Sequence, residues 1–228
     1  MSSALPVVLV PGFATSAART WGDNGWIDLL ADIGRLAVPL DILGSGSAEK
    51  PHEPAEYADV EEHLYARFPE GPVDAIGFSL GARTLLTLAA THPERFGSLI
   101  VAGVGRNLFE RDSTSDSIAS AIDGTGDSDD PVVRYFVQLA ESPDQDPLAL
   151  AAFMRRPGGV PITADLLARI TCPVLVVLGD RDFAGPADPL LEALPDARLR
   201  ILRNVDHFAT PKDFGFIDAA LEFLASTA

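Results

Sequence analysis

The sequence predicts an α/β protein in which helices cover both faces of one mostly parallel, doubly wound sheet. Three observations predict this class. Short aliphatic runs recur along the chain, most of them end at a turn that contains glycine, and segments with helical apolar spacing separate them. Continuous apolar runs are typical of strands covered on both faces. Such sheets bind ligands beyond the carboxyl ends of their strands, so functional residues are expected in the loops at that edge.

The first half of the chain is expected to supply four strands, which are residues 7–10, 36–42, 73–78 and 99–103. A helix that begins near Trp26, with Asp23 or Asn24 as its cap, is expected to end at Gly34. Two further helices are expected over residues 54–68 and 80–91. The alternation of strand and helix therefore holds throughout this half.

Between residues 106 and 170 the alternation stops. Residues 112–130 are rich in Ser, Asp and Gly and predict a mobile loop. Short helices are expected over residues 131–140, with Asp130 as the cap, and over residues 147–156 and 163–170. These helices are too short to enclose a core of their own. We therefore expect residues 106–170 to form a helical lid inserted into a single domain that spans residues 1–228.

The last part of the chain returns to the alternation. Strands are expected over residues 173–178 and 198–202, with a helix over residues 188–194 between them. A C-terminal helix is expected to begin at Thr210 and Pro211 and to carry the apolar residues Phe214, Ile217, Leu221 and Leu224.

Composition excludes several classes of function. The net charge of −16 repels phosphate backbones and anionic membranes, so we expect neither a nucleic-acid nor a membrane partner. Cys172 is the only cysteine, which rules out an internal disulfide. The apolar run at residues 7–10 is far too short for a signal-peptide core or a membrane span, which favours a soluble, cytoplasmic protein. Motifs for nucleotide phosphates, dinucleotides and zinc are missing from the sequence, so no cofactor and no metal are expected.

One stretch carries a specific chemical signal. Residues 73–78 form an apolar run that ends in Gly77-Phe78-Ser79-Leu80-Gly81 and continues directly into a helix-forming segment. A strand, a very tight turn and a helix in this order push the serine hydroxyl out of the sheet edge, beside the free N–H groups of the helix N-terminus. Glycine is needed on both sides because a Cβ there would collide with the neighbouring strand or helix. Ser79 is therefore the candidate nucleophile, and the alternative is an ordinary N-capping serine.

A serine hydroxyl becomes a good nucleophile only when a base accepts its proton. His207 is the candidate base because it alone of the four histidines follows an expected core strand directly. His52 lies in a loop beside prolines, His63 lies on an acidic helix face, and His92 ends a helix. The alternative for His207 is a turn histidine without a catalytic role.

A carboxylate that orients the imidazole is expected between Ser79 and His207 in the sequence, after another strand. Asp180 and Asp182 both follow the strand at residues 173–178. Asp182 is preferred because it lies farther along the loop, where its side chain can turn back towards His207, whereas Asp180 directly follows the turn glycine. Asp206 is less suitable, since adjacent side chains in an extended loop point apart.

The oxyanion of an acyl-transfer intermediate needs two convergent N–H donors. We expect the backbone N–H groups of Phe13, after the Pro-Gly turn, and of Leu80, at the helix N-terminus, to supply them. Apolar side chains in the loops and the lid are candidates for a substrate pocket, and each has plain core packing as the alternative. They are Trp21, Phe78, Phe136, Phe153, Met154, Phe183 and Phe208.

Taken together and in order, these motifs resemble the α/β-hydrolase superfamily. The resemblance covers residues 1–105 and 171–228. It rests on Val8-Leu9-Val10-Pro11-Gly12-Phe13, Asp41-Ile42-Leu43-Gly44-Ser45-Gly46-Ser47 with Lys50-Pro51, Gly77-Phe78-Ser79-Leu80-Gly81, Pro93-Glu94-Arg95-Phe96, Gly179-Asp180-Arg181-Asp182 and Asp206-His207-Phe208. The resemblance implies the α/β-hydrolase fold, the chain order serine, aspartate, histidine, and the acid at the last position of Gly-x-x-Asp, which is Asp182.

The sequence departs from the family pattern in two residues and in length. Pro11 and Ser45 stand where members of the family often have histidine. The donors to the oxyanion are backbone groups, so Pro11 leaves the Phe13 amide available. The short N-terminus predicts a trimmed sheet of about six strands.

The function expected from these residues is that of a serine hydrolase with a Ser79-His207-Asp182 triad, acting on a small carboxylic ester or a related acyl substrate. The same triad also serves carbon–carbon cleavage, lactone opening and perhydrolysis, because fold and triad do not fix the substrate. A different class remains open, in which the protein senses a ligand through a retained pocket without turnover. The oligomeric state is not predicted.

Overall fold

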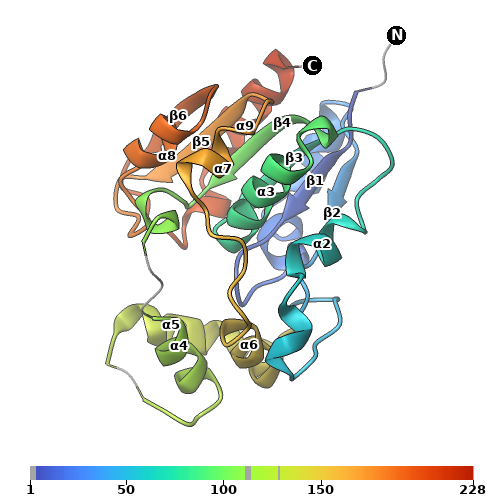
Figure 1. The fold of residues 1–228 in the computed structure, drawn as a ribbon. Coiled ribbons are helices and arrows are strands. Elements are labelled where there is room, and N and C mark those ends of the chain that lie inside the picture. Colours follow the sequence, from blue (N-terminus) through green and yellow to red (C-terminus); the bar gives the residue numbers. More distant parts are fainter. Residues whose placement is uncertain (1–3, 111–113, 128, 228) are drawn as a thin grey trace.

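The computed structural model describes residues 4–110, 114–127 and 129–227. Its centre is one sheet of parallel strands in the order β2-β1-β3-β4-β5-β6, which confirms the predicted fold class (Figure 1). The strands are β1 (Val7–Val10), β2 (Ala37–Pro39), β3 (Val73–Phe78), β4 (Phe96–Ala102), β5 (Val174–Gly179) and β6 (Ala197–Leu202).

The sheet grows in two directions from β1, because β2 and β3 pair with opposite edges of that strand. Ligands of open parallel sheets bind where the strand order changes direction in this way, at the carboxyl ends of the strands. The register pairs Val10 with Gly77 and Phe78 with Ala102. The turns that follow β1, β3 and β4 therefore meet at the same edge of the sheet.

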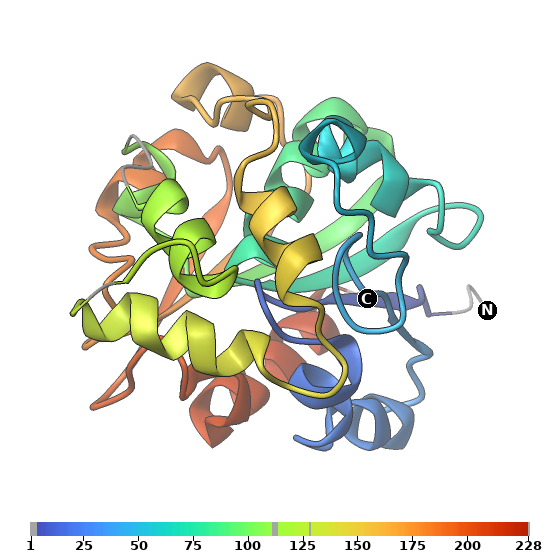
Figure 2. The same ribbon diagram turned by 90° about the horizontal axis from the view of Figure 1, so that it is seen from below.

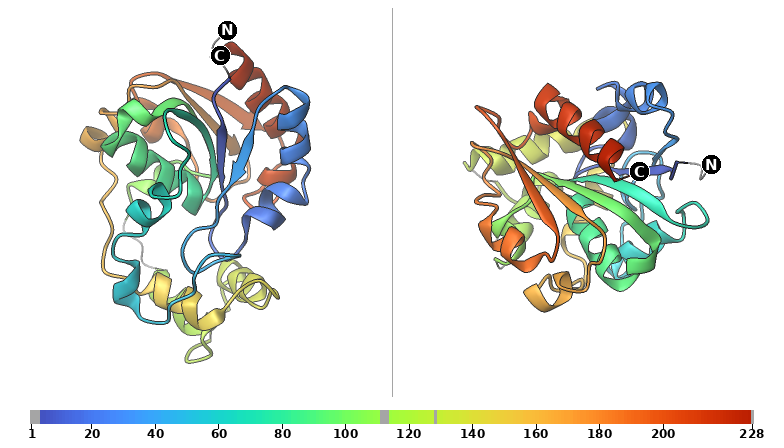
Figure 3. Two further views of the ribbon diagram at one scale, coloured as in Figure 1. Left: turned by 90° about the vertical axis from the view of Figure 1, so that its right-hand side faces the viewer. Right: turned by 90° about the horizontal axis from the view of Figure 1, so that it is seen from above.

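Helices cover both faces of the sheet. One face carries α1 (Trp26–Asp32), α9 (Phe214–Ser226) and a π-helix over Ala18–Gly22. The other carries α2 (Val60–Tyr65), α3 (Leu80–Thr91), α7 (Ala164–Leu167) and α8 (Asp188–Ala193). The view from above in Figure 3 shows α1 and α9 on one side of the strands and α3 on the other. Short 3₁₀ helices complete the connections at Pro54–Tyr57, Pro93–Arg95, Arg106–Leu108 and Thr210–Lys212.

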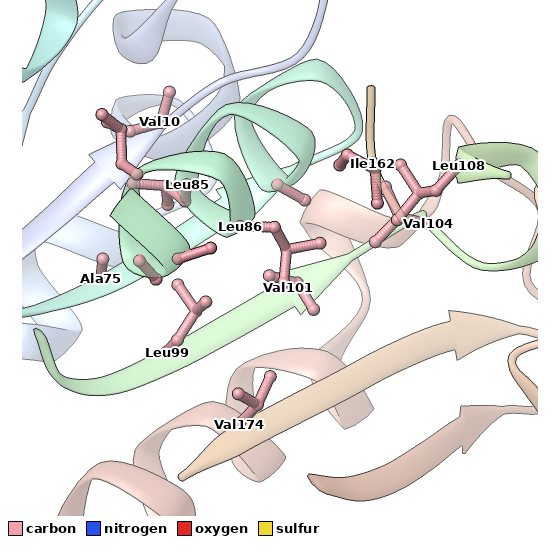
Figure 4. Packing of buried hydrophobic residues seen from close by; sticks show 14 of the residues in the cluster. Val10, Ala75, Leu85, Leu86, Leu99, Val101, Val104, Leu108, Ile162 and Val174 are labelled. Atoms are coloured by element: carbon pink, nitrogen blue, oxygen red, sulfur yellow. The ribbon is translucent and has the colours of Figure 1, made fainter. Parts of the chain in front are cut away.

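Two apolar clusters hold these layers together. In the first, Leu85 and Leu86 of α3 pack against Val10 and Val101 of the sheet (Figure 4). The second lies on the opposite face, where Trp26 packs against Phe216 with ring centroids 4.7 Å apart. Both clusters follow from the strand sequences, because β1, β3 and β5 are buried along their whole length and present alternate side chains to each face.

The inserted helices lie beyond the carboxyl ends of the strands, as Figure 1 shows from the side and Figure 2 from below. They are α4 (Ser115–Ile122), α5 (Pro131–Ala140) and α6 (Pro147–Met154). Ile118, Ile122, Val133 and Leu150 form a small apolar cluster among these helices. We call α4, α5 and α6 the lid helices. The rest of the insertion, with Ile162, Leu167 and Ile170, packs into the cluster around α3 instead.

The structure corrects the expected element boundaries in the first half of the chain. Only Ala37–Pro39 of the expected strand over residues 36–42 pairs with β1. Pro39 has no N–H to donate, and beyond it only the Leu40 N–H bonds to β1, by donating to the Leu9 carbonyl oxygen at 3.0 Å. The expected helix over residues 54–68 is divided into a 3₁₀ turn and α2, because Asp59 has a non-helical backbone (φ −114°, ψ 40°). Gly25, not Asp23 or Asn24, is the N-cap of α1.

Two further expectations are wrong. Residues 112–130 were expected to be a loop, but within their described part Ser115–Ile122 forms α4. The segment is mostly polar, but Ile118, Ala119 and Ile122 lie on one face of the helix and are buried. The C-terminal helix was expected to begin at Thr210 and Pro211, but Thr210–Lys212 forms a separate 3₁₀ turn, and Phe214 is 81% exposed. The helix begins at Phe214, after the Asp213 cap, and its buried face starts at Phe216.

Among the described residues, no helix combines the length and the apolarity needed to cross a membrane. Within the same described ranges, no group of three or more His, Cys, Asp or Glu side chains is arranged to hold a metal ion.

Candidate active site

The turn between β3 and α3 has an unusual backbone. Ser79 has φ 53° and ψ −111°, a conformation that non-glycine residues rarely adopt and that costs on the order of 1–3 kcal/mol. Its N–H donates to the carbonyl oxygen of Ala102 at 2.8 Å, which ties the turn to the end of β4. The side chain of Ser79 therefore leaves the sheet at its carboxyl edge, as the sequence predicts.

The two flanking glycines are required by close packing. A Cβ on Gly77 would lie 2.7 Å from the backbone nitrogen of Ala82, and one on Gly81 would lie 2.3 Å from the carbonyl oxygen of Val10. Contacts this short with backbone atoms cannot be relieved by a side-chain rotation. The start of α3 therefore approaches both its own strand and the turn after β1 more closely than any other residue type allows.

Ser79, His207 and Asp182 form one chain of hydrogen bonds. Ser79 Oγ lies 3.0 Å from His207 Nε2. On the far side of the ring, His207 Nδ1 lies 2.9 Å from Asp182 Oδ1 and 3.0 Å from Oδ2. A proton on Nδ1 donated to this carboxylate leaves a lone pair on Nε2, directed at the serine hydroxyl. The arrangement can accept a proton from Ser79 and return it to another oxygen nearby.

Packing fixes the orientation of the imidazole. The ring of His207 is 3% exposed and lies between Phe78 and Phe183, with centroids 4.9 and 4.3 Å away. A Cβ on Gly103 would lie 3.1 Å from His207 Cε1, so the backbone after β4 closes one edge of the ring site. Asp182 Oδ1 also accepts the N–H of Ala184 at 2.9 Å, which holds the carboxylate in place.

The rival acids serve other roles. Asp180 accepts the N–H of Asn204 at 2.7 Å, and Asp206 accepts the N–H of Ala209 at 2.9 Å. Both therefore stabilise the loop that carries His207, and neither forms a hydrogen bond with the imidazole among the described interactions. These hydrogen bonds explain why neither aspartate is the partner of His207, because each side chain is already directed at a backbone N–H of a turn.

The other histidines lie elsewhere. His52 pairs with Asp146 at 2.9 Å, and His92 pairs with Glu62 at 3.0 Å. His63 is exposed on α2, as its acidic surroundings predict. Among the four histidines, the structure therefore brings His207 to the serine.

The expected oxyanion donors lie beside the serine. Phe13 and Leu80 line the same cavity as Ser79. Within the described part of the chain, no hydrogen bond is recorded for the N–H of either residue. The turn that carries Phe13 lies close to Ser79, since a Cβ on Gly12 would be 3.5 Å from Ser79 Cβ. Two amides at this edge are thus available to an oxygen bound above Ser79.

Two cavities flank Ser79. The smaller, of about 270 Å³, is bounded by Phe78, His207, Phe208 and residues of the π-helix turn. The larger, of about 830 Å³, extends under the lid helices and is lined by Phe153, Met154 and Phe183. Phe136 lines both cavities. Six of the seven expected pocket side chains therefore face one cavity or the other.

Trp21 is the exception and corrects the expectation for the pocket. Its side chain is fully buried and packs edge-on against Trp26, with ring centroids 5.2 Å apart. It lines neither cavity beside Ser79. The π-helix turns this residue inwards to the core cluster beneath α1, a local geometry that the sequence pattern does not indicate.

Polar contacts tether the lid helices to the sheet domain. Asp146 caps α6 by accepting from the N–H of Leu148 at 2.9 Å and also pairs with His52. Burial alone would raise the pKa of Asp146, but the hydrogen bonds from His52 and from the Ala149 N–H hold it below its ordinary value. Arg19 and Asp144 form a second tether at 3.4 Å.

Three further residues at the site were missed by the sequence reasoning. Tyr135 stacks on Phe208 with ring centroids 3.7 Å apart and lines the smaller cavity. Arg83 and Arg156 line the larger one. Arg83 has a signal in the sequence, because it lies one helical turn after Ser79 on the same side of α3. Arg156 has no such signal, since its approach depends on the position of the lid.

The fold and the geometry of this site define a class of protein, and comparison with known proteins agrees. Residues 7–222 match the model of the alpha/beta hydrolase family. The chain belongs to this family, and the protein is a hydrolase.

Solved structures extend the comparison. MenH from S. aureus superimposes with a TM-score of 0.79 at 18% identity, covering 100% of this chain and 96% of that one. A serine hydrolase involved in carbazole degradation (CarC enzyme) gives a TM-score of 0.72 at 24% identity, with 97% and 91% covered. The esterase EaEST from Exiguobacterium antarcticum gives 0.73 at 19%, with 99% and 93% covered. At these identities the likeness concerns the fold.

Proposed function

We propose that the protein is a serine hydrolase that cleaves small carboxylic esters, with Ser79 as nucleophile, His207 as base and acid, and Asp182 as the orienting carboxylate. One observation carries the proposal. A serine with a strained turn backbone stands 3.0 Å from an imidazole nitrogen whose partner nitrogen stands 2.9 Å from a buried carboxylate. Nucleophile, base and orienting acid in this order are the recurring elements of acyl transfer through a covalent intermediate.

The acylation step uses these atoms in turn. Ser79 Oγ attacks the ester carbonyl carbon while His207 Nε2 takes the hydroxyl proton. The carbonyl oxygen becomes an anion, and the N–H groups of Phe13 and Leu80 stabilise it, each worth roughly 10²- to 10³-fold in rate. The carbon–oxygen bond to the alcohol then breaks, and the imidazolium gives its proton to the departing oxygen. Asp182 stabilises the imidazolium throughout and keeps Nδ1 protonated.

The deacylation step repeats the sequence with water. His207 Nε2 takes a proton from a water molecule, the hydroxide attacks the acyl carbon, and the bond to Ser79 Oγ breaks as the proton returns to the serine. The products are the free acid and the restored enzyme. No cofactor takes part in this cycle.

Other chemistries of the same site remain alternatives. Lactone opening, carbon–carbon cleavage and perhydrolysis use a similar triad. The names of the similar structures include a serine hydrolase and several esterases, which favours hydrolysis of an ester here. A panel of esters graded by acyl length, run beside lactones and a peroxide assay, separates these reactions by their kcat/KM.

A non-catalytic ligand sensor is the alternative of a different class, and a fluorophosphonate probe decides between them. An active triad gives stoichiometric phosphonylation of Ser79, located by peptide mass mapping, whereas a bare pocket gives little labelling. Ser79→Ala is expected to abolish both labelling and turnover. Ser117→Ala, on the exposed side of α4, is the matched control and is expected to keep both. Esterase activity that survives in Ser79→Ala would show that the assignment is wrong.

A further inference from the structure

The amide of Phe13 depends on the turn that carries it. Within the described part of the chain, no hydrogen bond is recorded for the Phe13 N–H, so no partner of its own fixes its direction. The turn runs from the end of β1 at Val10 to Ala17, where the π-helix begins. An amide that stabilises a developing oxyanion must already be in place when the charge forms. The contacts at the two ends of this turn therefore decide whether Phe13 can serve the reaction.

The middle of the turn is strained. Ala14, the residue after Phe13, has φ 56°, which lies in the left-handed region that residues other than glycine rarely adopt. Ala14 is 1% exposed and packs in the apolar cluster of the lid helices. A strained backbone persists only where the surrounding structure holds it. Firm anchors are therefore needed on both sides of Ala14.

The sheet supplies the first anchor. Val10 pairs with Gly77 of β3. A Cβ on Gly12 would lie 3.1 Å from Cδ1 of Phe78, so the start of the turn packs closely against the end of the same strand. This end of the turn is held by the pairing that also places Ser79.

Asp41 supplies the second anchor. It lies just beyond β2, the strand that pairs with β1 on the other side. Asp41 Oδ1 accepts the Ala17 N–H at 2.7 Å. Asp41 Oδ2 accepts the N–H and the hydroxyl of Ser47, each at 2.8 Å. Hydrogen bonds to a carboxylate are about twice as strong as neutral ones, so this side chain holds the far end of the turn firmly.

The surroundings of Asp41 leave these donors as its partners. The residue is 6% exposed, and none of the ion pairs recorded for the described residues includes it. A Cβ on Gly46 would collide with the carboxylate, so the loop after β2 wraps closely around it. A buried charge must be compensated by hydrogen bonds or by a counterion. The carboxylate therefore joins the turn after β1 to the loop that carries Ser47.

We infer that Asp41 is a positioning residue for the oxyanion hole, which holds the turn after β1 so that the Phe13 N–H faces the carbonyl oxygen of the substrate. The inference rests on the proposed ester hydrolysis. Asp41 does not touch the reacting atoms, and its effect passes through Ala17 and the strained Ala14 to Phe13. The Phe13 hydrogen bond reaches its full strength only in the transition state. Its loss is therefore expected to lower kcat and to leave KM nearly unchanged.

Asp41→Asn tests the anchor. Asparagine has one acceptor oxygen, which is expected to stay with the two donors of Ser47. The NH₂ group then faces the Ala17 N–H, and two donors cannot form a hydrogen bond with each other. One oxyanion donor is worth roughly 10²- to 10³-fold in rate, so a displaced Phe13 amide is expected to lower kcat about 10- to 100-fold. KM for a p-nitrophenyl ester is expected to stay within about threefold of wild type.

A trifluoromethyl ketone separates an oxyanion effect from a loss of active protein. Ser79 Oγ adds to the ketone carbon, the serine proton passes to His207 Nε2, and the ketone oxygen becomes an anion in the oxyanion hole. The inhibition constant of the ketone is expected to rise in Asp41→Asn by about the factor by which kcat falls. A smaller fraction of active protein would leave this constant unchanged. The corresponding trifluoromethyl alcohol forms no bond to Ser79 and is expected to inhibit variant and wild type equally.

Ser47→Ala and Ser98→Ala form a matched pair of milder variants. Each removes a hydroxyl that donates to an aspartate, at 2.8 Å to Asp41 and at 2.7 Å to Asp74. Asp74 lies near the amino end of β3, at the opposite edge of the sheet from Ser79. Ser47→Ala is expected to lower kcat and weaken the ketone about 3- to 10-fold, whereas Ser98→Ala is expected to leave both as in wild type. If thermal unfolding shows that Asp41→Asn does not fold, this pair decides the inference.

The outcomes separate this inference from the proposed function. A kcat and a ketone inhibition constant within about threefold of wild type in Asp41→Asn overturn the inference and leave the hydrolase assignment standing. Equal weakening of the ketone and the alcohol also overturns it, as does a loss in Ser98→Ala as large as that in Ser47→Ala. If Ser79→Ala keeps its turnover and the fluorophosphonate probe leaves Ser79 unlabelled in wild type, the proposed function fails, and the inference fails with it.

Discussion

Replacing Asp182 by asparagine tests the orienting carboxylate with the smallest change in shape. The carboxylate makes three close contacts in the structure. Oδ1 lies 2.9 Å from His207 Nδ1 and accepts the Ala184 N–H at 2.9 Å, and Oδ2 lies 3.0 Å from Nδ1. An asparagine keeps one oxygen and replaces the other by an NH₂ group, so all three contacts cannot be satisfied at once.

The magnitude follows from the two ways in which the amide can lie. With its oxygen kept at the Oδ1 position, the amide still accepts the Ala184 N–H and stays 2.9 Å from His207 Nδ1, but its NH₂ group takes the Oδ2 position, 3.0 Å from Nδ1. The NH₂ donor disfavours the tautomer with its proton on Nδ1, and a proton on Nε2 blocks proton transfer from Ser79. With the amide turned, NH₂ faces the Ala184 N–H, and a buried donor without a partner costs about 1–3 kcal/mol. Either orientation also removes the charge that stabilises the imidazolium. The combined loss is expected to be roughly 10⁴-fold in kcat, as in other triads of this kind.

The assay is steady-state hydrolysis of a p-nitrophenyl ester by wild-type and variant protein, with thermal unfolding as the check on the fold. Asp180→Asn and Asp206→Asn are the matched controls. These aspartates hold turn amides instead of the imidazole, so each is expected to change kcat by less than about tenfold. The reasoning is refuted if Asp182→Asn stays within a few-fold of wild type, or if either control loses as much activity as Asp182→Asn.

Two further predictions concern stability. Gly81→Ala is expected to lower the free energy of unfolding by about 3 kcal/mol or more, because its Cβ would lie 2.3 Å from the Val10 carbonyl oxygen. Gly22→Ala is the control, since nothing lies within 4 Å of the Cβ it would add. Equal urea unfolding midpoints for the two variants would contradict the packing argument. Burial raises the pKa of the Cys172 thiol to about 11. Well below pH 9 the thiol is protonated in both the folded and the unfolded chain. Between about pH 9 and 11 the unfolded chain ionises first, so the free energy of unfolding should fall by roughly 3 kcal/mol at most. Cys172→Ala should show a shallower decline over this range in urea unfolding, and identical pH profiles would rule the burial effect out.

Elements with strong local signals agree closely with the sequence predictions. The helix expected over residues 80–91 is α3, because the glycine turn fixes its start and His92-Pro93 its end. The helix expected over residues 131–140 is α5, where Asp130 accepts the Val132 N–H as the predicted cap. In both cases the deciding interactions are made within a few residues of the helix end.

Elements without a local signal were missed. α4 forms in a segment whose composition predicts a loop, because Ile118 and Ile122 bury their side chains against the other lid helices. Trp21 was expected in the pocket, yet the π-helix directs it into the core. These outcomes depend on contacts between segments that are far apart in the sequence, and a short stretch of residues read by itself does not reveal such contacts.

The candidate site divides in the same way. The sequence by itself determined where a nucleophile, a base and an acid can stand, because loops after parallel strands meet at one edge and Ser79, Asp182 and His207 all follow strands. The sequence preferred Asp182 as the acid, but only the tertiary structure shows why the other two aspartates do not reach the imidazole, since Asp180 and Asp206 accept backbone N–H groups of nearby turns. The division of space around Ser79 also arises only when the lid lies over the sheet. The positions of strands and turns along the chain are encoded locally, whereas the direction of a loop side chain is set by contacts with residues from elsewhere in the chain.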